Sequence, residues 1–144
     1  MKQLSLIEKA FFLKKTSLFR ELDLDLLLAI AEKMPQDIYD ANESVFEINQ
    51  RATRMYFIVS GGVQIFDARE KPIFKLASED FFGEESLLSE LPRKYLAICT
   101  TKTLFLTLPP TSLLTILTEC PSVALSLLQN YAKNIHNRFL KPSE

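Results

Sequence analysis

The residues with the clearest chemical potential lie in one segment, Asp80 to Arg93, which interrupts a series of short predicted strands. Gly83 allows the backbone to approach a ligand closely, and a helical turn beginning after it would present free N–H groups to an anion. Arg93 is placed to close on the same anion with its planar guanidinium. Glu84 offers two acceptor oxygens, which suit sugar hydroxyls and not phosphate. Together these residue types predict a site for a sugar phosphate.

The elements around this segment are predicted to be strands. Short runs rich in β-branched and aromatic residues alternate with polar or glycine turns, a pattern that favours a sandwich, roll or barrel. Gly61-Gly62 predicts a hairpin between two of the runs, because tight primed turns need positive φ. The predicted strands are Asp37–Asp40, Ser44–Ile48, Met55–Val59, Val63–Phe66, Pro72–Leu76, Tyr95–Cys99 and Thr103–Leu108.

Helical periodicity appears at both ends of the chain. One helix is predicted around Phe11 and a second with Asp23 as its N-cap and Pro35 as its end. A short helix over Thr111–Thr118 follows the last strand, and Pro121 suits the first turn of a longer final helix. One apolar face of that final helix is predicted to pack on the core: Ala124, Leu127, Leu128, Tyr131, Ile135 and Phe139.

Several motifs resemble the cyclic-nucleotide-binding domain family, and the resemblance covers nearly the whole chain. That family includes the regulatory subunits of cyclic-nucleotide-dependent kinases, the cytoplasmic domains of nucleotide-gated channels and the bacterial catabolite activator. Residues 13–22 resemble its opening segment, residues 55–63 its central hairpin, and Pro121 with the helix after it its closing helix. Its phosphate-binding cassette, here residues 81–96, is matched by Phe82-Gly83-Glu84, Leu87-Leu88 and Pro92-Arg93.

The resemblance implies a mainly β fold with flanking helices, a double-stranded β-helix or jelly-roll-like roll with a short helix inside the cassette. One domain is expected over residues 1–144: N-terminal helices in 1–34, the roll in 35–108 and C-terminal helices in 109–144.

The resemblance also implies roles for the cassette residues. In the family, the glutamate matching Glu84 binds the ribose 2′-hydroxyl, and the arginine matching Arg93 pairs with the cyclic phosphate. Backbone N–H groups matching two further residues assist, and the residue after the arginine helps to sort guanine from adenine. The candidate ligand-binding residues are therefore Gly83, Glu84, Glu85, Ser86, Arg93, Lys94 and Leu96.

Four residues depart from the family's pattern. Leu96 stands where a Thr or Ser hydroxyl usually reaches the phosphate, and Glu85 adds a negative charge where an aliphatic residue is usual. Tyr95 replaces a small residue and is large enough to crowd the pocket. Asn49 replaces a glycine, a mild change because Asn tolerates positive φ. Loss of one hydrogen bond to a charged group costs roughly 1.5–3 kcal/mol, about ten- to a hundredfold in affinity.

Composition argues against other classes of function. The 144 residues carry a net charge of −1, which gives no strong pull toward nucleic acid or an anionic membrane. No apolar run is long enough to span a membrane, and the N-terminus lacks a signal-peptide pattern. Cys99 and Cys120 have no metal or redox spacing and are expected to be reduced, buried thiols of a cytoplasmic protein. The one histidine, His136, lies on the final helix, so neither an enzyme nor a metal or other cofactor is expected.

Two functions of different class remain open. The first is a regulatory module that binds cAMP or cGMP and signals by moving its closing helix against a partner. The second is a degenerate domain that keeps the roll as a protein-interaction or dimerisation scaffold. The expected partners are a cyclic nucleotide and either another protein or a second copy bound through the C-terminal helix. A helix-turn-helix module after the closing helix is not expected, because the chain ends at Glu144.

Overall fold

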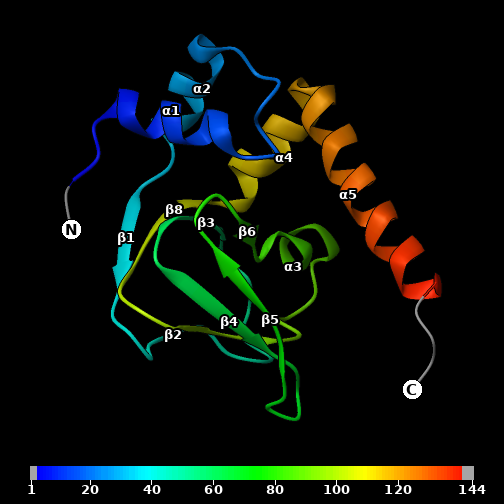
Figure 1. The fold of residues 1–144 in the computed structure, drawn as a ribbon. Helices are drawn as coiled ribbons and strands as arrows, with labels where there is room; N and C mark the ends of the chain where they lie inside the picture. The colour runs from blue at the N-terminus through cyan, green and yellow to red at the C-terminus, as the bar shows by residue number, and fades with distance from the viewer. Residues whose placement is uncertain (1–2, 141–144) are drawn as a thin grey trace.

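The computed structural model describes residues 3–140, and the side chains of residues 3–134. In this part of the chain eight strands form two four-stranded antiparallel sheets, with the orders β1-β8-β3-β6 and β2-β7-β4-β5. Helices flank the roll that the sheets build (Figure 1). The predicted mainly β fold with flanking helices is confirmed. The strands are β1 Gln36–Tyr39, β2 Ser44–Phe46, β3 Met55–Ser60, β4 Gly62–Phe66, β5 Pro72–Ala77, β6 Phe81–Phe82, β7 Leu96–Cys99 and β8 Thr103–Leu108.

Strand β3 shows how the alternation of side chains divides the core in two. Met55 and Phe57 belong to one hydrophobic cluster, which includes buried residues of the helices. Tyr56 and Ile58 belong to a second cluster, an aromatic one inside the roll. Successive side chains on a strand point to opposite faces of the sheet. The sheet containing β3 is therefore covered by helices on one face and by the roll interior on the other.

The two N-terminal helices begin at residues whose side chains cap them. In α1, Leu6–Lys15, Ser5 and Glu8 form a capping box, and in α2, Leu24–Ala31, Asp23 is the N-cap as predicted. The others are α3 Glu84–Ser89, α4 Pro110–Glu119 and α5 Pro121–Leu140. Figure 1 shows α1 and α2 over one end of the roll and α5 running down its side past α3.

The apolar face predicted for α5 is partly wrong. Leu127 is buried and Tyr131 is half-buried, but Leu128 is 64% exposed, while Val123 takes a buried place that the prediction omitted. Adjacent residues of a helix point about 100° apart, so Leu128 turns away from the roll when Leu127 faces it. The predicted positions Ile135 and Phe139 lie outside the described side chains.

A second correction concerns Gly61-Gly62. The strands on either side, β3 and β4, belong to different sheets and do not pair, so the predicted hairpin is wrong. Gly61 has φ +103°, and a Cβ there would overlap Thr103 Oγ1. The glycine therefore carries the chain from one sheet to the other through a space without room for a side chain.

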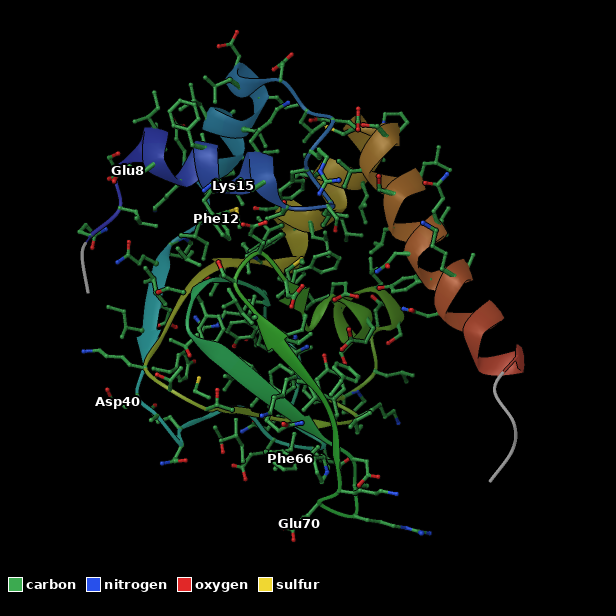
Figure 2. The ribbon with its side chains drawn as sticks, in the orientation of Figure 1. Glu8, Phe12, Lys15, Asp40, Phe66 and Glu70 are labelled. Atoms are coloured by element: carbon green, nitrogen blue, oxygen red, sulfur yellow. The ribbon has the colours of Figure 1, made fainter. Side chains whose placement is uncertain are left out.

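The hairpin lies one strand later, between β4 and β5. In Figure 2 Phe66 and Glu70 mark its far end, remote from Glu8, Phe12 and Lys15 of α1. Asp67 closes the turn, because its carboxylate accepts from the backbone N–H groups of Arg69 and Lys71.

No single helix of the described chain is long and apolar enough to cross a membrane. Helix α4 and the Pro121–Asn134 part of α5 pass that test only as a pair, and they are bent by 105°.

Candidate functional site

Two residues at opposite ends of the cassette come into direct contact. Gly83 follows β6 with φ +86° and is the N-cap of α3. Arg93 Nη1 donates to the Gly83 carbonyl oxygen at 2.6 Å. A Cβ at position 83 would lie 3.0 Å from the same nitrogen. Glycine is therefore needed here both for its backbone conformation and for the close approach of the guanidinium.

The Arg93 guanidinium is enclosed within the roll. Its side chain is 2% exposed, Nη2 donates to the Arg54 carbonyl oxygen at 2.5 Å, and its guanidinium carbon lies 4.0 Å from the ring centroid of Phe46. Backbone hydrogen bonds to the loop of Asn49 and Gln50 hold the residue in place. Asn49 adopts φ 71°, the conformation anticipated where the family has glycine.

This buried cation has no counter-charge in contact. Within residues 3–134 Arg93 forms no ion pair, and its Nε has no hydrogen-bond partner. Burial lowers the pKa of Arg93 from its ordinary value, although an arginine in a protein remains protonated. Buried charges are normally paired, so the guanidinium is a group that would gain from a nearby anion.

Glu84 connects the cassette to the final helix. Its side chain is 5% exposed, and its carboxylate accepts a hydrogen bond from the Tyr131 hydroxyl of α5 at 2.6 Å. Burial, followed by the charge of the neighbouring Glu85, raises the pKa of Glu84 to about 7. The position of α5 and the protonation of Glu84 are therefore physically linked.

Tyr95 occupies part of the same region. Its hydroxyl accepts the Gly83 N–H at 3.1 Å, and its ring centroid lies 5.3 Å from that of Phe46. Burial and, after it, the negative charge of the adjacent Glu85 carboxyl raise the pKa of Tyr95. One carboxyl oxygen of Glu85 is buried without a partner in the described chain.

A cavity of about 390 Å³ opens between the roll, α3 and α5. Four of its side chains are carboxylates, and Arg93 is not part of its lining. The lining comprises Ser17, Phe74, Leu76, Glu79, Asp80, Phe81, Phe82, Glu84, Glu85, Tyr95, Asn130, Tyr131 and Asn134.

The seven residues predicted from the sequence do not all meet at this cavity. Glu84 and Glu85 line it, while Gly83 and Arg93 contact each other but are not part of the lining. The remaining three lie elsewhere: Ser86 is buried and lines a separate cavity of about 400 Å³, Lys94 is exposed, and Leu96 is half-buried on β7 opposite Phe66.

Three residues at the site were not among the predicted ones. Phe46 covers the guanidinium, Arg54 supplies a backbone carbonyl, and Tyr131 holds Glu84. The spacing of apolar residues places Tyr131 on the core face of α5. No local pattern predicts its contact with Glu84, because the two residues are 47 positions apart in the sequence. Among the described residues no group of three or more His, Cys, Asp and Glu side chains is arranged to hold a metal ion.

Comparison with known proteins gives a family match over the roll and α4. Residues 36–120 match the model of the cyclic nucleotide-binding domain. The chain is 29% identical over 83 residues to the cAMP-dependent protein kinase regulatory subunit of Debaryomyces hansenii, a match covering 58% of this chain and 18% of that protein. The similarity therefore spans less than a fifth of this relative's length.

Solved structures show the same fold. The catabolite activator protein of Thermus thermophilus superposes with a TM-score of 0.80 at 24% identity, covering 87% of this chain and 61% of that one. The regulatory subunit of a cAMP-independent protein kinase A from Trypanosoma brucei superposes with a TM-score of 0.76 at 17% identity, covering 90% and 47%. At such identities the likeness concerns the fold alone.

Proposed function

This chain belongs to the cyclic nucleotide-binding domain family, and on that premise we propose that it is a non-catalytic regulatory module that binds cAMP or cGMP. The nucleotide would sit in the cavity beside α3, with its phosphate at Arg93 and its ribose at Glu84. The closing helix α5 would transmit occupancy to a partner.

The buried guanidinium of Arg93 is the observation that carries the proposal. It is 2% exposed, makes no ion pair in the described chain and keeps one N–H without an acceptor. A cyclic phosphate would supply both the missing negative charge and an acceptor for that N–H. Charge-assisted bonds of this kind are about twice as strong as neutral ones.

The contact between Glu84 and Tyr131 suggests how occupancy is transmitted. The Tyr131 hydroxyl on α5 occupies the acceptor that a ribose hydroxyl would need. A bound nucleotide would compete for Glu84 and release this contact, which changes the position that α5 prefers. A ligand can shift such an equilibrium only by its different affinity for the two states.

The same proposal covers partners and location. Leu125 and Leu128 of α5 are 55% and 64% exposed and would suit a protein partner or a second copy of the chain. The two buried thiols, Cys99 and Cys120, are free, which suits the cytoplasm. We propose no cofactor besides the nucleotide, and neither nucleic acid nor a membrane as a partner.

Calorimetric titration and thermal shift with cAMP and with cGMP test the proposal. At about one hundred times the dissociation constant, a ligand stabilises the folded state by about 2.7 kcal/mol. Arg93→Lys tests the role of the guanidinium, because lysine keeps the charge but loses the planar fork. We expect this variant to bind the nucleotide about tenfold more weakly. Absence of any response to both nucleotides would contradict the proposal.

A second candidate is a scaffold that binds no nucleotide. It is favoured by one specific arrangement: the Gly83 N–H and the Glu84 carboxylate are already occupied by the hydroxyls of Tyr95 and Tyr131. The same titration separates the candidates, since a scaffold would respond to neither nucleotide while still binding a partner through α5.

A further inference from the structure

Tyr95 is in contact both with the cavity and with the residues around the Arg93 guanidinium. The tyrosine lines the cavity, and its ring packs against Phe46. Phe46 in turn covers the guanidinium of Arg93, which does not reach the cavity lining. A phosphate that entered through the cavity would therefore meet Tyr95 on its way to Arg93.

Glu84 is placed differently from Arg93. Its side chain lines the cavity directly, together with Tyr131. A sugar hydroxyl can thus approach Glu84 while Tyr95 stays in place. The obstruction concerns the phosphate end of the site and not its sugar end.

We propose that Tyr95 is a gate that sets the affinity of this domain for phosphate-bearing nucleotides. In the closed state its hydroxyl accepts the Gly83 N–H at 3.1 Å. In the open state the side chain has moved aside, so that the Gly83 N–H and the guanidinium are both available to a phosphate. This inference rests on the proposed binding of a cyclic nucleotide and adds the residue that limits it.

Glu85 lies beside the gate. It lines the cavity together with Tyr95, and, after burial, its negative charge is among the causes that raise the pKa of the Tyr95 hydroxyl. Both residues depart from the family's pattern at this place.

The expected effect on affinity follows from the population of the closed state. An apparent dissociation constant is raised by the inverse of the fraction of molecules that are open. Closure by one hydrogen bond and one ring contact would favour the closed state by about tenfold. Removal of the side chain should therefore tighten phosphate binding by about tenfold.

The experiment is a calorimetric titration of the whole chain, as wild type, Tyr95→Ala and Tyr95→Phe, with cAMP, cGMP and adenosine. Adenosine carries the same sugar and base as cAMP but no phosphate. We expect Tyr95→Ala to bind cAMP or cGMP about tenfold more tightly than wild type and adenosine within about twofold of it. Tyr95→Phe keeps the ring but loses the hydroxyl, so a smaller gain is expected. Circular dichroism melting shows whether each variant folds.

The outcomes separate the gate from the proposed function. If wild type binds a cyclic nucleotide and Tyr95→Ala binds it no more tightly, the gate is overturned while the proposed function stands. If no variant binds either nucleotide, both are overturned. Binding by Tyr95→Ala alone supports the gate, whereas an equal gain for adenosine overturns its selectivity for phosphate. If Tyr95→Ala does not fold, Tyr95→Phe decides: tighter binding of cAMP supports the gate and unchanged binding overturns it.

Discussion

Arg93 and Glu84 come from one short segment and are buried to nearly the same extent, at 2% and 5% exposure, yet their surroundings differ in kind. Arg93 is held by fixed parts of the roll: the carbonyls of Gly83 and Arg54 and the ring of Phe46 on β2. Glu84 is held by a single hydroxyl, that of Tyr131 on a separate helix.

The difference suggests that the two ends of the site have different functions. Backbone carbonyls and a packed ring keep the cation end in one geometry whether or not a ligand is present. The carboxylate end depends on where α5 lies, and α5 is anchored to the core through Val123 and Leu127, one or two turns before Tyr131. An anchored end suits binding, and an end shared with a helix suits the transmission of a signal.

The largest loss of stability is expected when Arg93, at the anchored end of the site, is removed. Arg93→Ala leaves two carbonyls and the face of Phe46 without their partner, and we expect it to lower the free energy of unfolding by about 2–4 kcal/mol. Urea denaturation measures the loss. Arg51→Ala, which removes an exposed arginine of the neighbouring loop, is the matched control and should change stability by less than about 0.5 kcal/mol. If the two variants lost the same free energy of unfolding, Arg93 would be held no more firmly than an exposed arginine.

Glu84 is expected to have a smaller effect on stability, and one that depends on pH. Burial and Glu85 raise its pKa from 4.5 to about 7, so the folded protein keeps a proton that the unfolded chain releases near 4.5. The contribution of protonated Glu84 to the free energy of unfolding is fully present below about pH 4.5. It is lost as the pH rises toward 7, and the loss is on the order of 2 kcal/mol. Arg93, Tyr95 and Tyr131 are the other titratable groups that face it.

Glu84→Gln tests this dependence, because an amide does not titrate but still accepts from Tyr131. We expect the variant's melting temperature to stay level between about pH 5 and pH 7, where that of the wild type falls. Glu90→Gln, at the exposed end of the same helix, should leave the wild-type slope in place. An unchanged slope in Glu84→Gln would assign the pH dependence to another group.

Local signals in the sequence were sufficient for much of the fold. The strand Thr103–Leu108 has its predicted bounds, and Asp23 caps α2, because side-chain alternation and capping act within a few residues. Pairing between strands is not local. The Gly61-Gly62 turn was recognisable, but its glycines do not say that β3 pairs with β8 while β4 pairs with β5 and β7.

In the site, too, local features could be predicted from the sequence and contacts between distant elements could not. Residue chemistry and the family's spacing predicted that Gly83 and Arg93 act together, and the two are in contact in the structure. The covering of Arg93 by Phe46 and the bond from Tyr131 to Glu84 depend on how distant elements pack, which no spacing reveals. The roles in binding stay predictions for all seven predicted residues: Gly83, Glu84, Glu85, Ser86, Arg93, Lys94 and Leu96.

The smallest effect is expected at the contact between the two regions. Tyr131→Phe removes one hydroxyl and leaves the ring, so we expect a loss of about 1 kcal/mol in global stability. The larger consequence should be local: faster hydrogen exchange of backbone amides in residues 128–134, because α5 loses its bond to the cassette while Val123 and Leu127 stay packed. Leu128→Ala, which truncates an exposed side chain of the same helix, should not change exchange there by this route.

The same variant also tests the coupling between helix position and charge. The Tyr131 hydroxyl lowers the pKa of Glu84, in opposition to burial and to Glu85. Its removal should therefore move the loss of stability to higher pH, because Glu84 holds its proton more firmly without that donor. If Tyr131→Phe changed neither the exchange of α5 nor the pH at which stability is lost, Glu84 would be held by the roll alone. The two ends of the cassette would then be equally fixed, and α5 could not report occupancy through this contact.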